Sequence, residues 1–129
     1  ELFFNPQRLL RYSRGDIVFL DFGFNVGTEF GGLHWAVVIE DNPKTSGNVT
    51  VVPLSSLDKN KSIENLHRGE VYLGYIQGPG KQLPTYAKVN QIRAVSKIRI
   101  YKPKRVSDGL YRLTNEQLDK IDEDNPINP

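Results

Sequence analysis

The chain has 129 residues, of which 38% are hydrophobic and 25% charged, and this composition predicts one folded, soluble domain over residues 1–129 rather than a disordered chain. It has no cysteine, which excludes disulfides, thiol catalysis and cysteine zinc sites, and two histidines alone make no convincing metal site. No segment reaches the ~20 apolar residues that cross a membrane, and a formal net charge of +2 is too small to indicate a polyanion partner.

The first half of the chain predicts strands joined by turns. A short helix is expected over residues 5–12, since Asn5 suits an N-cap and Pro6 suits the first helical position. Short β-branched and aromatic runs then predict three strands, over residues 16–22, 33–41 and 49–54. Pro53 has no N–H to donate to a ladder, so the third strand is expected to end there or to lie at a sheet edge.

The second half predicts further short strands and a closing helix. Residues 55–66 are polar and predict a loop with a short helical turn. The elements expected after it are strands at 69–76, 85–90 and 98–101, a turn at 77–81 and a helical turn at 91–97.

The C-terminal helix carries its own start and stop signals. Thr114 and Gln117 have the spacing of a capping box, and Leu118 and Ile121 give the helix an apolar stripe. The Asn-Pro pair at 125–126 should stop it. Five or six short strands with such a helix predict a mainly β fold, a small closed barrel.

A glycine-rich loop at residues 23–32 connects the first two predicted strands. Glycine opens backbone conformations closed to other residues and lets a ligand approach closely. Glu29 lies in this loop and His34 directly beyond it. The loop thus brings a candidate acid and a candidate base to the ends of two predicted strands. Loops of this kind often carry function.

Positive charge is concentrated in one part of the chain. Residues 84–105 hold seven basic side chains and no acidic one. Such a face can attract phosphate chains, which favours a nucleic-acid partner. A lysine-rich strand edge that discourages aggregation explains the same pattern, and charge alone does not choose between them.

Several segments, in order, resemble one known family. They are Arg-Gly-Asp-Ile-Val at 14–18, Asp-Phe at 21–22, Gly-Thr-Glu-Phe-Gly-Gly at 27–32, Ala-Val-Val-Ile at 36–39, Val-Val-Pro-Leu-Ser-Ser at 51–56 and Asn-Gln-Ile-Arg-Ala-Val-Ser-Lys-Ile-Arg at 90–99. Together they resemble the MazF/PemK toxins of bacterial type II toxin–antitoxin systems. The likeness spans about residues 14–101, and residues 68–83 and the chain ends carry little of it.

The resemblance implies a mainly β, SH3-like barrel of the MazF/PemK/CcdB type, with short helices and a C-terminal helix. It implies a cytoplasmic homodimer that needs neither metal nor cofactor. Such a protein is a sequence-specific endoribonuclease that cuts single-stranded RNA, chiefly mRNA, and so stops translation and growth. The products are a 2′,3′-cyclic phosphate and a 5′-hydroxyl end, and a cognate antitoxin protein blocks the RNA groove.

The chain departs from the family pattern at its centre. The family has arginine, usually followed by proline, where this chain has His34 and Trp35. A guanidinium stays charged and can clamp phosphate, whereas an imidazole changes protonation near neutral pH. The family also has threonine at the position of Ser55, which is a milder change because serine keeps the hydroxyl.

The expected catalytic residues are His34, Ser55 and Glu29. His34 is interpreted as an acid or base, or else as a structural histidine at a strand start. Glu29 is the complementary base or simply holds the loop by accepting backbone N–H bonds. Ser55 donates to the scissile phosphate or merely closes a strand, and Ser56 is its alternative.

The expected RNA-binding residues are Arg14, Phe30, Gln91, Arg93 and Lys97. Arg14 contacts phosphate or pairs with an acid, and Gln91 and Arg93 reach base edges unless Arg93 is structural. Lys97 belongs to the basic pair of the last matching segment. Candidates for base stacking are Phe24, Phe30, Trp35 and Tyr86, although Trp35 is more readily interpreted as core.

Two other functions stay open. A toxin on the same barrel that binds gyrase would use exposed aromatic residues on its C-terminal helix, but the apolar residues here, Leu118 and Ile121, read as core-facing. A catalytically inactive member would bind RNA or antitoxin without cutting RNA. The absence of the family's arginine at position 34 is the observation that supports this alternative.

Overall fold

The computed structural model describes residues 11–23, 32–41, 46–76, 83–101 and 111–124. The expected helix at 5–12 and the turn at 77–81 fall largely or wholly outside these ranges, and Arg11 and Tyr12 are not helical. The elements in the described residues are β1 (Asp16–Asp21), β2 (Leu33–Val38), β3 (Asn48–Ser56), η2 (Ile63–Asn65), β4 (Glu70–Ile76), β5 (Leu83–Lys88), η3 (Val89–Gln91), β6 (Arg93–Ser96), η4 (Lys97–Arg99), β7 (Ile100–Tyr101), β8 (Tyr111–Arg112) and α1 (Asn115–Asp124).

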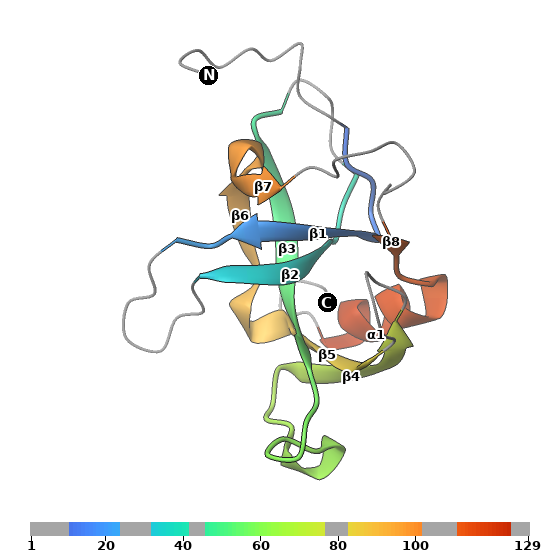
Figure 1. The fold of residues 1–129 in the computed structure, drawn as a ribbon. Helices are drawn as coiled ribbons and strands as arrows, with labels where there is room; N and C mark the ends of the chain where they lie inside the picture. Colours follow the sequence, from blue (N-terminus) through green and yellow to red (C-terminus); the bar gives the residue numbers. More distant parts are fainter. Residues whose placement is uncertain (1–10, 24–31, 42–45, 77–82, 102–110, 125–129) are drawn as a thin grey trace.

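The strands form one curled antiparallel sheet (Figure 1). Its order is β4-β5-β3-β2-β1-β7, with β6 also paired to β3 and β8 also paired to β1. The helix α1 lies beside β4 and β5 in Figure 1. The predicted mainly β, SH3-like barrel with a C-terminal helix is therefore confirmed. None of the helices in the described residues is long and apolar enough to span a membrane.

Strand β3 is the centre of the sheet, and the prediction that it ends at Pro53 is wrong. Its first part pairs with β6 through Val51, and its last part, from Leu54 to Ser56, pairs with β5. Pro53 lies between these two ladders and still pairs with Ala36 of β2. The missing N–H is tolerated because Pro53 sits where β3 changes partners, so residues 55 and 56 belong to a strand and not to a loop.

The segment predicted as a helical turn at 91–97 contains a strand instead. The 3-10 turn η3 ends at Gln91, and β6 follows, pairing Val95 with Val49 and Arg93 with Val51. Val95 is buried and its neighbour Ala94 exposed, the alternation of a strand with one covered face. Pairing with β3 decides the conformation here, because β structure depends on neighbours more than on local preference.

Two clusters of buried side chains lie on opposite faces of β1, β2 and β3. The barrel cluster is Tyr12, Val18, Leu20, Phe22, Ala36, Val38, Val49, Val51, Val95 and Ile100. The helix cluster is Ile17, Val37, Val52, Leu54, Leu73, Ala87, Val89, Leu113, Leu118 and Ile121. Adjacent residues such as Val37 and Val38 thus face different clusters. Burial on both faces explains why these strands are continuous apolar runs in the sequence.

The capping box predicted for the C-terminal helix is confirmed. The backbone N–H of Gln117 donates to Thr114 Oγ1 at 3.2 Å, and the Thr114 N–H donates to Gln117 Oε1 at 2.9 Å. Leu118 and Ile121 are buried as predicted. Gln117 Nε2 also donates to the Leu73 carbonyl at 2.9 Å, which fixes α1 to β4. The last helical residue is Asp124.

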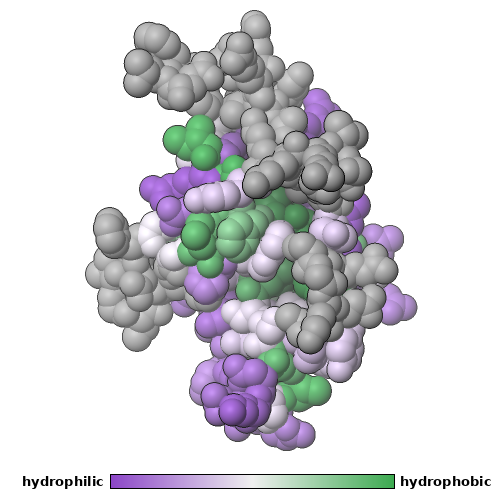
Figure 2. Space-filling view, viewed as in Figure 1, coloured by the Kyte–Doolittle hydropathy of each residue, from purple (hydrophilic) through white to green (hydrophobic). Residues whose placement is uncertain are grey.

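Aromatic side chains gather over β1, β2 and β7. The ring of Phe19 lies 4.9 Å from that of Trp35 and 5.7 Å from that of Tyr101. Trp35 is 37% exposed and Tyr101 57% exposed, so the interpretation of Trp35 as a core residue is wrong. Figure 2 shows hydrophobic and near-neutral side chains over β1 and β2. We call Phe19, Trp35 and Tyr101 the aromatic face.

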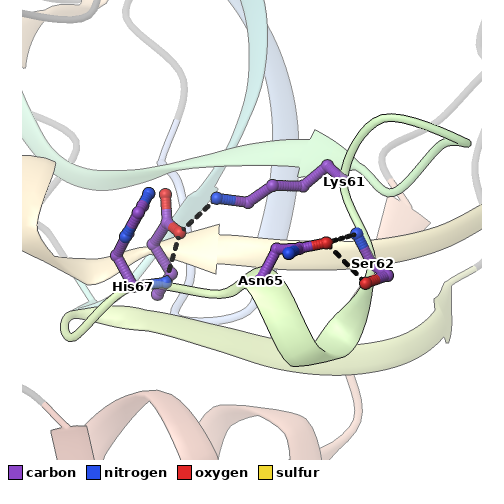
Figure 3. A network of polar contacts seen from close by, with 5 residues as sticks. Lys61, Ser62, Asn65 and His67 are labelled. Atoms are coloured by element: carbon purple, nitrogen blue, oxygen red, sulfur yellow. Dashed lines mark hydrogen bonds and ion pairs between the residues drawn. The ribbon is translucent and has the colours of Figure 1, made fainter.

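The connection between β3 and β4 is fixed by a buried carboxylate (Figure 3). Glu70 Oε1 accepts from Lys61 Nζ at 2.8 Å and from the His67 backbone N–H at 2.8 Å. Beside it, Asn65 Oδ1 accepts from the N–H and hydroxyl of Ser62 in the predicted short helical turn. Burial by itself would raise the pKa of Glu70, but the donors Lys61 and His67 N–H outweigh burial, and the pKa is lowered.

Replacing Lys61 by Met should destabilise the protein in a pH-dependent way. The pKa of Glu70 is lower in the folded protein than in the unfolded chain, where it is about 4.3. The ionised carboxylate therefore stabilises the folded state at pH values above the unfolded pKa, and this contribution is lost as the pH falls through the folded-state pKa. Lys61→Met should therefore lower the unfolding free energy by about 1–2 kcal/mol at pH 7 and by much less at pH 3. Urea unfolding at both pH values measures this, with Lys59→Met, at an exposed neighbouring lysine, as the control. Equal losses at the two pH values would contradict it.

Candidate functional site

The glycine-rich loop leaves the sheet from a closed base. The Phe22 N–H donates to the Gly32 carbonyl and the Gly32 N–H donates to the Gly23 carbonyl, both at 2.8 Å. Gly23 and Gly32 have φ of +80° and +82°, which side-chain-bearing residues rarely adopt. Glu29 and Phe30 lie outside the described residues, so their expected roles stay predictions.

His34 lies directly beyond this base, near the start of β2. It pairs with Leu20 of β1 and is half-buried. Because side chains alternate along a strand, His34 shares its face with Ala36 and so continues the barrel cluster. Its ring centroid is 6.5 Å from that of Phe22, at an angle of 50°. The imidazole therefore stands at the end of the barrel from which the loop departs.

Ser55 comes to the same face from β3. Ala36 and Pro53 form the last pair of the β2–β3 ladder, and His34 and Ser55 are each two residues beyond it on their own strands. Both residues lie on the face of the barrel cluster, since each is two positions beyond a paired residue on its own strand. Ser55 is half-buried, whereas Ser56 is exposed and belongs to the opposite face. Of the two serines, Ser55 is the one that shares a face with His34.

Gln91 and Arg93 reach this end of the barrel from η3 and β6. The Arg93 guanidinium carbon lies 5.0 Å from the centroid of the Phe22 ring, and Arg93 Nη2 donates to Gln91 Oε1 at 3.2 Å. Arg93 pairs with Val51, a member of the barrel cluster. The Phe22 ring is therefore in contact range of an imidazole and a guanidinium from two different strands.

Tyr86 extends the site along β5, but not in the way that the sequence predicts. It pairs with Ser55 in the ladder between β3 and β5. Lys61 and Lys88 place their Nζ atoms 5.4 and 5.9 Å from its ring centroid, and Tyr86 is only 7% exposed. Its ring is thus engaged by cations rather than open to a base. Sequence reasoning did not assign either lysine to the site, since only the folded chain brings both to Tyr86, the β5 partner of Ser55.

Arg14 lies apart from this group and has an acidic partner. Its Nη2 donates to Asp122 Oδ2 of α1 at 2.7 Å, and its backbone N–H donates to Asp41 Oδ1 at 2.7 Å. The neighbouring carboxylate of Asp16 is bound by Arg112. Pairing with a solvent-facing acid, one of the two interpretations of Arg14, is what the structure shows. A phosphate role for Arg14 stays a prediction.

Lys97 is also not at the surface of the candidate site. It is 3% exposed, and its Nζ lies 5.8 Å from the centroid of the Tyr12 ring. Burial, with a smaller effect from Arg11, lowers the pKa of Lys97. Arg99 instead is exposed, and its Nη1 donates to the Asp21 carbonyl at 3.4 Å, beside the base of the glycine-rich loop. Of this basic pair, Arg99 is the residue that reaches the site.

The arrangement combines three groups suited to phosphate chemistry. An imidazole can exchange a proton near neutral pH, a hydroxyl can donate a hydrogen bond, and a guanidinium supplies a permanent charge. Among the residues that the structure describes, no group of three or more His, Cys, Asp and Glu could hold a metal ion. The described part of the site therefore offers acid–base and charge-stabilising groups.

Comparison with solved structures shows the same fold in a MazF protein and in endoribonucleases. MazF (Form-I) from Deinococcus radiodurans superposes with a TM-score of 0.57 and 20% identity, covering 89% of this chain and 93% of that one. An endoribonuclease from Mycobacterial species gives 0.55 and 16%, covering 88% and 86%. A third structure, an endoribonuclease in complex with its cognate antitoxin from Mycobacterial species, gives 0.52 and 16%, covering 87% and 86%.

None of the curated proteins compared with the chain matches it. The family model described as "PemK-like, MazF-like toxin of type II toxin-antitoxin system" matches residues 13–124, which include every described strand and α1. The barrel, the loop base and the group around His34 all lie within this match. The chain therefore belongs to the PemK-like, MazF-like toxin family of type II toxin–antitoxin systems.

Proposed function

We propose that the protein is a sequence-specific, metal-independent endoribonuclease that cuts single-stranded RNA, chiefly mRNA, in the cytoplasm and thereby stops translation. The observation that carries the proposal is that His34, Ser55 and Arg93 share the face of the barrel cluster, with His34 and Arg93 both near the Phe22 ring. Family membership and the endoribonucleases among the solved structures support it.

The proposed reaction is transesterification within the RNA strand. The 2′-oxygen attacks the adjacent phosphorus as the bond from phosphorus to the 5′-oxygen breaks. One group removes the proton of the 2′-hydroxyl and another protonates the departing 5′-oxygen, which leaves a 2′,3′-cyclic phosphate and a 5′-hydroxyl. His34 takes one of these proton transfers and Glu29 the other. Ser55 donates a hydrogen bond to a phosphate oxygen.

RNA is held along the face that carries His34 and Ser55. Gln91 and Arg93 from η3 and β6, with Phe30 of the glycine-rich loop, are the proposed contacts. Arg14 and Lys97 are less favoured, since Arg14 is paired with Asp122 and Lys97 is buried against Tyr12. Arg99 and Lys88, both near the described site, are proposed as further cationic contacts.

The two rival functions have less support. A gyrase-directed toxin would need exposed aromatic residues on α1, but this helix has no aromatic residue and buries Leu118 and Ile121. A catalytically inactive member that only binds RNA or antitoxin would not need an imidazole and a hydroxyl on the same face. Both rivals are outcomes of the first experiment below.

Purified protein should cut long single-stranded RNA in excess EDTA and leave 2′,3′-cyclic phosphate and 5′-hydroxyl ends. His34→Ala should cut at least ~10²-fold more slowly, since one general acid or base typically contributes ~10²–10⁴-fold. Gel analysis of end-labelled RNA with end-group assays measures both. Intact RNA after incubation with folded, antitoxin-free protein would favour the binding or gyrase-directed function, and full activity of His34→Ala would remove the histidine from the mechanism.

Ser55→Ala and Ser56→Ala form a matched pair. Loss of a hydrogen bond to a charged phosphate costs about 1.5–3 kcal/mol, so Ser55→Ala should slow cleavage roughly 10- to 100-fold. Ser56→Ala should cut at nearly the normal rate, because this serine is exposed on the other face. Single-turnover cleavage rates of the two variants check this. The reverse order of the two effects would mean that Ser56 faces the phosphate.

We propose protein partners for the aromatic face, namely a second copy of the chain in a homodimer and a cognate antitoxin. Exposed aromatic side chains that cluster on one sheet surface are typical of protein interfaces. One of the solved structures with this fold is an endoribonuclease bound to its antitoxin.

Trp35 provides a direct probe of the dimer, because it is the only tryptophan of the chain. If the aromatic face is covered in the dimer, serial dilution should shift Trp35 fluorescence to longer wavelength as the ring enters water. Tyr101→Asp should move this transition to higher protein concentration, whereas Tyr75→Asp, at an exposed tyrosine of β4, should not. A Trp35 emission that stays constant while sedimentation shows dissociation would place the dimer interface elsewhere.

A further inference from the structure

Arg93 keeps its full charge in a half-buried position. Its guanidinium carbon lies 5.0 Å from the centroid of the Phe22 ring and its Nη2 donates to the amide oxygen of Gln91, and both of these partners are neutral. The ion pairs among the described residues join Arg14 to Asp122, Lys61 to Glu70 and Arg112 to Asp16. Arg93 takes part in none of these three.

A cation held in this way is oriented but not neutralised. Contact with an aromatic ring and an amide positions the guanidinium, yet leaves its charge available to an anion. Partial burial without a counter-ion also has a free-energy cost, which an anionic ligand would offset. Lys61 differs from Arg93 in this respect, because its charge is already neutralised by Glu70, whose carboxylate oxygen lies 2.8 Å from Lys61 Nζ.

The location of Arg93 relates it to the reacting groups. The Phe22 ring lies 5.0 Å from the Arg93 guanidinium carbon and 6.5 Å from the His34 ring. Val51, the partner of Arg93, and Ser55 lie on the same face of β3. Arg93 is on β6, the strand paired with the first part of β3, and its side chain lies over Phe22 on the face that also carries His34 and Ser55. A phosphate bound on this face between His34 and Ser55 can therefore be approached by Arg93.

We propose that Arg93 is a catalytic residue that binds a non-bridging oxygen of the scissile phosphate and stabilises the charge of the pentacovalent transition state. This inference rests on the proposed function. The bond from the 2′-oxygen to phosphorus forms and the bond to the 5′-oxygen breaks, while Arg93 stays protonated and transfers no proton. His34 and Glu29 transfer the protons, and Arg93 supplies the permanent positive charge.

Two other roles for Arg93 make different predictions. A residue that reads base edges would change which sequences are cut but not the rate at a preferred sequence. A residue that is purely structural would affect folding, and a small cation added to the solution would not replace it. A group that stabilises the transition state affects the chemical step more than RNA affinity.

The test compares Arg93→Ala with the unchanged protein under single-turnover conditions. The cleavage rate should fall by ~10²–10³-fold, the usual effect of removing one transition-state donor. Affinity for an RNA with a 2′-deoxy nucleotide at the cut site should fall far less. Added methylguanidinium should restore part of the rate of Arg93→Ala and leave that of His34→Ala unchanged. Lys120→Ala, which removes an exposed charge on α1, is the matched control and should behave like the unchanged protein.

Several outcomes would overturn the inference. Normal cleavage by folded Arg93→Ala, equal losses in rate and affinity without rescue, or only an altered sequence preference would each do so. If Arg93→Ala does not fold, Arg93→Lys decides, because it keeps the charge over Phe22 but loses the planar donors. Arg93→Lys should cut more slowly at normal affinity, and a normal rate would count against the proposal. Failure of the unchanged protein to cut any RNA would instead reject the proposed function itself, and Arg93's role with it.

Discussion

Strand β3 pairs with two different strands along one of its edges, and the rest of the barrel depends on this change of partner. Its first part pairs with β6 and its last part with β5, with Pro53 at the change of partner. On its other side it pairs with β2. This exchange accompanies the curl of the sheet, and because side chains alternate along the strand, Val51 faces the barrel cluster and Val52 the helix cluster. A continuous ladder would have required an N–H that proline lacks.

The curl also assembles the candidate site. The pairing of β2 with β3 puts His34 and Ser55 on one face of the sheet, and Arg93 meets Phe22 across the end of the barrel. Packing on both faces of the sheet fixes the strands that carry these side chains, which is the rigidity that a positioned acid, hydroxyl and cation require. The glycine-rich loop then begins and ends at one pair of backbone hydrogen bonds beside them.

The basic residues of the chain fall into two groups according to their partners. Arg14, Lys61 and Arg112 each have an acidic partner and stabilise connections between elements. Arg93, held by an aromatic ring and an amide, keeps its charge for a ligand. The count of basic residues between 84 and 105 therefore overstates the cationic surface, since Lys97 is buried against Tyr12. A buried cation is distinguished from a ligand-binding one only by its surroundings.

Local signals in the sequence determined the elements whose stability is itself local. The apolar runs of β1 and β2, the capping box of Thr114 and Gln117 and the apolar stripe of α1 were all predictable, as was membership of the toxin family from its ordered motifs. Tertiary structure alone decided that β3 continues past Pro53, that residues 93–96 form a strand, and that Trp35 is exposed. It also decided which basic residues are paired. The physical reason is that strand pairing, burial and ion pairing join residues distant in sequence, so a residue's own neighbours do not specify its partner.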